Sequence, residues 1–110
     1  MSRTSIADAV VSLEELLAAL TNAYWDTSNL ERKDCIFDLV TSLFAELNEL
    51  TKLSVEDHSM NYEPITFAFH SSTANLKNIQ NNIDLWFPRA STAKQLQDSI
   101  PSVAKLFEFV

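Results

Sequence analysis

The chain has 110 residues, which is about one domain's worth, and 46% of them are apolar. No apolar run approaches the roughly 20 residues that span a bilayer, and the first ten residues lack the apolar segment of a signal peptide, so we expect a soluble, cytoplasmic protein without membrane contact. The net charge of −7 repels a phosphate backbone, so we expect no direct nucleic-acid binding. The same charge is compatible with a basic protein partner, with mimicry of nucleic acid, or with solubility alone, which is the ordinary reason for such a charge.

The first predicted helix covers about residues 5–25. Its apolar residues recur at intervals of four and three, which places them on one stripe of a helix. They are Ile6, Val10, Leu13, Leu17, Leu20 and Tyr24. Ser5 precedes Asp8 by the spacing of a capping pair, so the helix is expected to begin at Ser5 or Ile6. The turn-favouring residues 26–29 predict its end near Trp25.

The second predicted helix covers about residues 29–53, and Ser28 with Glu31 has the spacing of a capping box at its start. Two overlapping apolar rows run along it. The first is Ile36, Val40, Leu43, Leu47 and Leu50, and the second is Leu30, Phe37, Val40, Phe44 and Leu47. Together the apolar positions cover an arc of about 180°, so we expect this helix to have neighbours on two sides. If the C-terminal segment docks elsewhere, a homodimer is the expected cover for the remaining apolar surface.

The segment after residue 63 has two interpretations. Residues 65–70 alternate apolar with small or polar side chains, as a short strand does. A longer four-three spacing favours a helix over about residues 64–87, with Pro64 in its first turn and Pro88 after its end. The residues that carry this spacing are Ile65, Phe69, Ser72, Leu76, Ile79, Ile83 and Trp86. We predict the helix because its pattern is the longer one, although its intrinsic propensity is poor.

The remaining residues are expected to add one or two short helices. Ser91 or Thr92 can cap a helix that ends near Ser99, and Pro101 can open another. No repeat, low-complexity tract or linker divides the chain. The sequence therefore predicts an all-α fold: one helical-bundle domain over residues 1–110, with three main antiparallel helices at about 5–25, 29–53 and 64–87.

Few residue patterns suggest catalysis, so we predict a protein that is not an enzyme and holds no cofactor or metal. The chain has no glycine, which excludes Gly-rich phosphate loops and the nucleophile elbow. Its single cysteine, Cys35, excludes an intramolecular disulfide and is expected to be a small apolar residue at the edge of the core.

The two histidines define the alternative function. His58 follows two acidic residues in a predicted loop, and Glu63 could join them around a metal, although consecutive loop positions lack the Glu-x-x-His spacing of di-iron bundles. A solvent-facing His70 midway along a helix of an acidic bundle resembles the phosphoacceptor of histidine phosphotransfer domains. The chain departs from that family because the next lysine, Lys77, comes seven residues later and no glycine follows. A His-dependent phosphocarrier or metal-binding domain is therefore the alternative to a binding module.

Two aromatic pairs are the leading candidates for a partner-binding site. Tyr24-Trp25 ends the first helix and Trp86-Phe87 ends the third, so antiparallel packing places both pairs at one end of the bundle, as a plug of the core or as an exposed anchor. Phe67 and Leu85 fall on the side of the third helix opposite its apolar stripe, which is a groove for a partner helix, a self-association surface or, as we expect, the place where the C-terminal segment docks. These residues are candidate contacts of a non-enzymatic protein-binding module: a small adaptor, inhibitor or chaperone-like factor.

Overall fold

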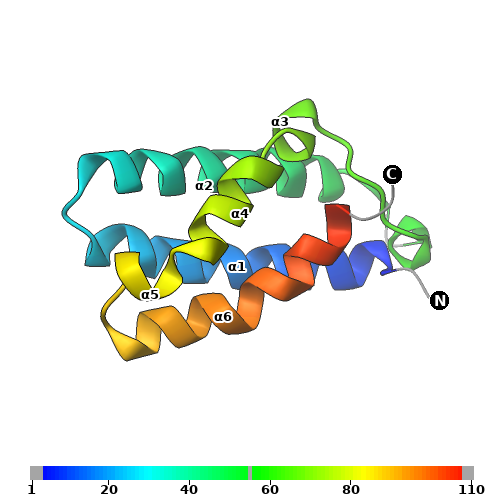
Figure 1. The fold of residues 1–110 in the computed structure, drawn as a ribbon. Helices are drawn as coiled ribbons and strands as arrows, with labels where there is room; N and C mark the ends of the chain where they lie inside the picture. The colour runs from blue at the N-terminus through cyan, green and yellow to red at the C-terminus, as the bar shows by residue number, and fades with distance from the viewer. Residues whose placement is uncertain (1–3, 55, 108–110) are drawn as a thin grey trace.

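The computed structural model describes residues 4–54 and 56–107 and shows an all-α bundle, which confirms the predicted fold class (Figure 1). The α-helices are α1 (Ile6–Asp26), α2 (Leu30–Leu50), α3 (Phe67–His70), α4 (Thr73–Asn81), α5 (Ile83–Trp86) and α6 (Ala90–Ala104). Two 3-10 turns, η1 (Glu56–Ser59) and η2 (Lys105–Phe107), complete the secondary structure. Residues 67–70 are helical, so the strand interpretation of that segment is wrong.

The two long helices α1 and α2 form an antiparallel hairpin, and α6 lies along the other side of α1 (Figure 1). α1 packs most extensively against α6 and next against α2. The short helix α4 crosses between α2 and α6 and contacts both. α2 contacts α1 on the hairpin side and also α3 and α4, as its wide apolar arc predicts.

Polar side chains define where α1 and α2 begin. Ser5 caps α1 as predicted, because its hydroxyl accepts a hydrogen bond from the Asp8 backbone N–H at 3.2 Å. The cap of α2 is Asn29 rather than Ser28, since the Asn29 side chain accepts from the Arg32 N–H at 3.1 Å. α2 ends at Leu50 instead of about residue 53, because the next residues tighten into bonds to carbonyls three residues back.

The core forms one cluster of buried apolar side chains contributed by α1, α2, the broken segment 62–87 and α6. On α2 the residues Ile36, Leu39, Leu43 and Leu50 are fully buried, and Val40 and Leu47 are partly buried against them. The first apolar row predicted on this helix is therefore the one that meets the core.

The expected long helix over residues 64–87 is wrong, because the structure divides this segment into α3, α4 and α5. Side-chain hydrogen bonds compete with the helical ladder at each break. Thr66 caps α3 by accepting from the Phe69 N–H at 3.1 Å, and the Ser72 hydroxyl donates to the Phe69 carbonyl at 2.7 Å. Between α4 and α5, the Asn82 side-chain amide donates to the Asn78 carbonyl at 2.7 Å. Each side chain satisfies a backbone group that a continuous helix would have paired.

The C-terminal segment also differs from the prediction, because α6 runs through Pro101 as a single helix. Pro101 lacks an N–H, so it removes one backbone bond, to the Gln97 carbonyl, while Ile100 and Val103 on either side are buried in the core. Neither Ser91 nor Thr92 caps this helix, whose N-cap is Arg89. The Thr92 hydroxyl donates instead to the Asp26 carboxylate of α1.

The sequence suggested that the C-terminal turns dock over Phe67 and Leu85, and this prediction is wrong. Phe67 is 83% exposed and Leu85 is 69% exposed. They belong to two separate helices, α3 and α5, so they do not lie on one helix face. Instead Leu106 is buried in the core, and the Phe107 ring stacks on Phe69 with 4.5 Å between centroids.

A carboxylate lies inside the core, at Glu46 on the inner side of α2. It is fully buried and accepts four hydrogen bonds from the segment that follows η1. The donors are the Tyr62 hydroxyl at 2.5 Å, the Ile65 N–H at 2.8 Å, the Thr66 N–H at 2.9 Å and the Thr66 hydroxyl at 3.0 Å. A buried charge is tolerated only when it is satisfied in this way, so Glu46 clamps residues 62–66 to α2.

The same segment is also tied to the start of α1. The Ile6 N–H donates to the Met60 carbonyl at 2.9 Å, and the Tyr62 N–H donates to the Thr4 carbonyl at 2.8 Å. Ser5 and Asn61 form an isolated antiparallel bridge between these bonds. The chain beyond η1 therefore joins the beginning of α1 to the inner side of α2.

Replacing Leu43 by Ala tests the α2 seam. Leu43 is fully buried, so the truncation should lower the free energy of unfolding by about 2 to 5 kcal/mol through lost burial and the cavity left behind. Chemical denaturation measures the change, and a loss below about 1 kcal/mol would contradict this core assignment.

Replacing Tyr62 by Phe tests the Glu46 clamp through its pH dependence. Burial and the hydrogen bond to Glu46 raise the pKa of Tyr62, so the folded protein keeps this phenol protonated where an unfolded chain loses its proton, above about pH 10. The stabilisation is complete below that pH and is lost above it, by about 1.4 kcal/mol per pH unit.

Urea denaturation of both proteins between pH 8 and pH 11 gives the comparison. At pH 8 the wild type should be the more stable protein by about 1 to 3 kcal/mol. This advantage should shrink as the pH rises beyond 10, and a difference that stays constant to pH 11 would contradict the shifted phenol.

Candidate functional site

Two aromatic pairs lie at the same end of the bundle, where α1 ends and α5 leads into α6. We call Tyr24, Trp25, Trp86 and Phe87 the aromatic end. Arg89, two residues after Phe87, brings its guanidinium within 3.5 Å of the Asp26 carboxylate, next to Trp25. The Thr92 hydroxyl of α6 bonds to the same carboxylate. These contacts hold the end of α1 against the start of α6.

Burial divides the aromatic end into a core part and a surface part. Phe87 is buried and belongs to the hydrophobic core. Tyr24 and Trp86 are partly buried against that core. Trp25, by contrast, is 75% exposed, although it is among the largest apolar side chains of the protein. Phe87 thus closes the core at this end, whereas Trp25 is the exposed residue of the four.

Cations from the start of α2 hold these rings. The Lys33 ammonium lies 4.1 Å from the Tyr24 ring centroid and 5.4 Å from that of Trp25, and it donates to the Tyr24 carbonyl at 2.7 Å. Tyr24 and Trp25 pack edge to face with 5.3 Å between centroids. The guanidinium of Arg32 lies 5.5 Å from the Trp86 centroid. Trp25 is therefore exposed but held by its neighbours.

The sequence interpretation missed these cations. The only signal was the position of Arg32 and Lys33 in the first turn of the second helix, just after a short connection from the aromatic pair. A hollow of about 300 Å³ at this end is lined by Trp25, Asp26, Pro88 and Arg89. A side chain of a partner could enter this hollow next to the exposed indole.

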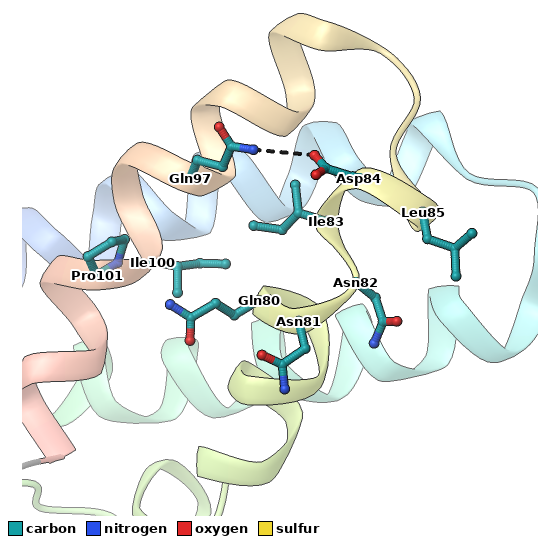
Figure 2. A pocket seen from close by; sticks show the side chains of 9 residues that line it. All are labelled: Gln80, Asn81, Asn82, Ile83, Asp84, Leu85, Gln97, Ile100 and Pro101. Atoms are coloured by element: carbon teal, nitrogen blue, oxygen red, sulfur yellow. Dashed lines mark hydrogen bonds between the residues drawn. The ribbon is translucent and has the colours of Figure 1, made fainter.

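A larger hollow of about 460 Å³ lies where α4 passes into α5, facing α6 (Figure 2). Its polar lining consists mainly of amides, from Gln80, Asn81, Asn82 and Gln97. The Gln97 amide donates to the Asp84 carboxylate at 3.4 Å across the hollow (Figure 2). Asp84 is the single ionisable residue among those that line it, so this hollow holds no pair of groups for acid-base catalysis.

The two histidines lie in different elements, His58 in η1 and His70 in α3. His58 lies in η1, and its Nε2 atom is buried without a hydrogen-bond partner among the described residues. His70 is exposed at the last position of the four-residue helix α3, not midway along a long helix. Within residues 4–54 and 56–107, no three His, Cys, Asp or Glu side chains gather closely enough to hold a metal ion.

Cys35 is partly buried where α2 meets α4. Burial raises the pKa of its thiol, the Asn78 amide 3.8 Å from the sulfur lowers it less, and the nearby Asp38 carboxylate raises it further. The net effect favours the neutral thiol, which is a poor nucleophile.

A second apolar surface lies on α2, away from the core. Leu30, Phe37 and Phe44 recur every seven residues and are 75%, 58% and 57% exposed. We call these three residues the α2 apolar row. They belong to the second row that the sequence pattern predicts, of which only Val40 and Leu47 are partly covered.

The chain matches no protein-family model, and no curated protein or solved structure matches it. Across residues 4–54 and 56–107, no helix combines the length and the apolar character that crossing a bilayer requires.

The reactivity of Cys35 tests whether the thiol is activated. Because its pKa is raised, Cys35 should react with a disulfide reagent more slowly than the same thiol in the urea-unfolded chain at pH 8. The rate of the folded protein should continue to rise at pH values where the unfolded thiol is already fully ionised. Faster reaction in the folded state would indicate an activated thiolate and contradict this assignment.

Proposed function

We propose that this protein is a non-enzymatic protein-binding module whose contact site is the aromatic end. The observation that carries the proposal is Trp25, an indole that is three-quarters exposed yet packed against Tyr24 and Lys33. Arg89 and the hollow beside it extend the site toward α6.

The chemistry of this site is that of a binding hot spot. Trp, Tyr and Arg are the residues most enriched where a few side chains supply most of the binding energy. An anchor that is already held by its neighbours loses little side-chain freedom when a partner covers it, so more of the contact energy appears as affinity. A partner that buries the exposed part of Trp25 in an apolar pocket would therefore gain binding affinity.

The mechanism would rest on binding energy alone, as in a small adaptor, an inhibitor or a chaperone-like factor. The partner is a protein that offers an apolar pocket to the exposed indole. The single cysteine, which can form no intramolecular disulfide, supports a cytoplasmic location.

Replacing Trp25 by Ala tests the proposed site. Affinity capture from an extract of the native host, with quantitative mass spectrometry, identifies proteins retained by the wild type. Trp25→Ala should reduce retention of the true partner at least tenfold, because truncating a hot-spot residue costs about 2 kcal/mol or more. The fold should be preserved, since exposed positions usually change stability by no more than about 0.5 kcal/mol.

Met60→Ala is the matched control, because Met60 is 59% exposed and lies beside the opposite end of α1. It should retain the partner as the wild type does. Equal retention by Trp25→Ala, or no protein retained above background, would contradict the proposed function. The same assay with Phe67→Ala and Leu85→Ala shows whether those two exposed residues also contact the partner.

A further inference from the structure

The α2 apolar row forms a nearly straight line on the surface. Residues seven apart on a helix drift by only about 20°, so Leu30, Phe37 and Phe44 follow one edge of α2 at intervals of about 10.5 Å. No other described element covers them, because the neighbours of α2 pack on its opposite side, where Leu39 and Leu43 are fully buried.

The size of this surface suits an interface. The exposed parts of Phe37 and Phe44 present roughly 200 Å² of apolar area, and Leu30 adds roughly 100 Å². A standard interface buries roughly 800 Å² on each partner, a little more than half of it apolar. The row therefore supplies most of the apolar centre that a stable interface of standard size needs.

The arrangement of the row is complementary to itself. Phe37 lies midway between Leu30 and Phe44, so a two-fold axis through Phe37 brings it against its own copy. The same axis places Leu30 of each chain against Phe44 of the other. Such a surface closes in one isologous contact and leaves no apolar residue of the row uncovered.

The charges beside the row are compatible with the antiparallel arrangement. On the exposed side of α2, Glu31, Asp34 and Asp38 lie in the N-terminal half and Glu49 in the second half, whereas Thr41 and Asn48 are neutral. An antiparallel pair places Asp34 opposite the neutral Thr41 of the other copy, on the same flank of the row. The charges elsewhere on the surface are screened beyond about 8 Å at physiological salt, so the net charge of −7 does not prevent this contact.

We propose that the α2 apolar row is the interface of a homodimer in which two α2 helices pack antiparallel about a two-fold axis at Phe37. The row contains none of the four residues of the aromatic end. The two Leu30 residues lie about 21 Å apart along the paired helices. Each aromatic end lies near the Leu30 of its own chain, so the two aromatic ends lie at opposite ends of the paired helices. The dimer thus presents two partner-binding sites that face opposite ends of the interface.

Sedimentation equilibrium over a wide range of protein concentration tests the assembly. The wild type should approach twice the chain mass of 12.4 kDa. Phe37→Glu places two carboxylates at the axis and should raise the dimer dissociation constant at least a hundredfold, with unchanged helical circular dichroism because Phe37 is exposed. The control Phe67→Glu changes another exposed phenylalanine, on α3, and should remain dimeric.

Cysteine cross-linking tests the orientation in a Cys35→Ala background. Phe37→Cys should form a disulfide with its own copy on oxidation, because the two positions meet at the axis. Leu30→Cys alone should not cross-link, whereas its mixture with Phe44→Cys should do so. Efficient cross-linking of Leu30→Cys by itself would indicate a parallel pair and overturn the proposed arrangement.

The assembly results also separate this proposal from the proposed function. A wild type that stays at 12.4 kDa at high concentration, or a dimer that survives Phe37→Glu, overturns the interface. A monomeric chain whose captured partner is lost with Phe37→Glu would show that a different protein covers the row, which also overturns the second copy as its occupant. Capture that depends on Trp25 remains valid in each case.

Discussion

The satisfaction of one buried charge determines how the second half of the chain folds. Glu46 lies on the inner side of α2, among residues that meet the core, and an unpaired carboxylate there would cost several kcal/mol. Backbone N–H groups of Ile65 and Thr66 are two of its four donors, and the Thr66 hydroxyl both donates to Glu46 and caps α3 by accepting from the Phe69 N–H. The connection therefore stays irregular up to Thr66, and this places Phe69 where it packs with Tyr62 and Phe107.

The sequence predicted the elements whose pattern is long and locally consistent. In α1 and α2 the four-three spacing, the polar caps and the intervening turn all agree, and the structure follows them within a few residues. Residues 64–87 carry the same spacing but also Thr66, Ser72 and Asn82, whose side chains bond to nearby backbone groups. Spacing alone could not show that these bonds would win, and the clamp at Glu46 requires partners almost twenty residues away.

The candidate site was predictable in part. Antiparallel topology was enough to bring the aromatic pairs to one end, but it could not decide that Phe87 would be buried and Trp25 exposed. That division depends on where α6 begins, and its start is fixed by the contacts of Arg89 and Thr92 with Asp26. Likewise, the second apolar row of α2 was visible in the sequence, whereas its exposure follows from α6 packing on α1 instead.

The packing of α1 against α6 sets an order for events during synthesis on the ribosome. These helices make the most extensive contact of the described fold, and Asn22 bonds to Gln95, which is 73 residues later. The small buried residues Ala19 and Ala23 share that side of α1 by their spacing, so they stay uncovered until α6 emerges. A nascent chain can pair α1 with α2 early, but it completes its core only when α6 is made. Until then the nascent chain exposes an apolar face that can aggregate or bind a chaperone. Substitutions in α6 should therefore lower the yield of folded protein even where they leave the stability of the folded protein unchanged.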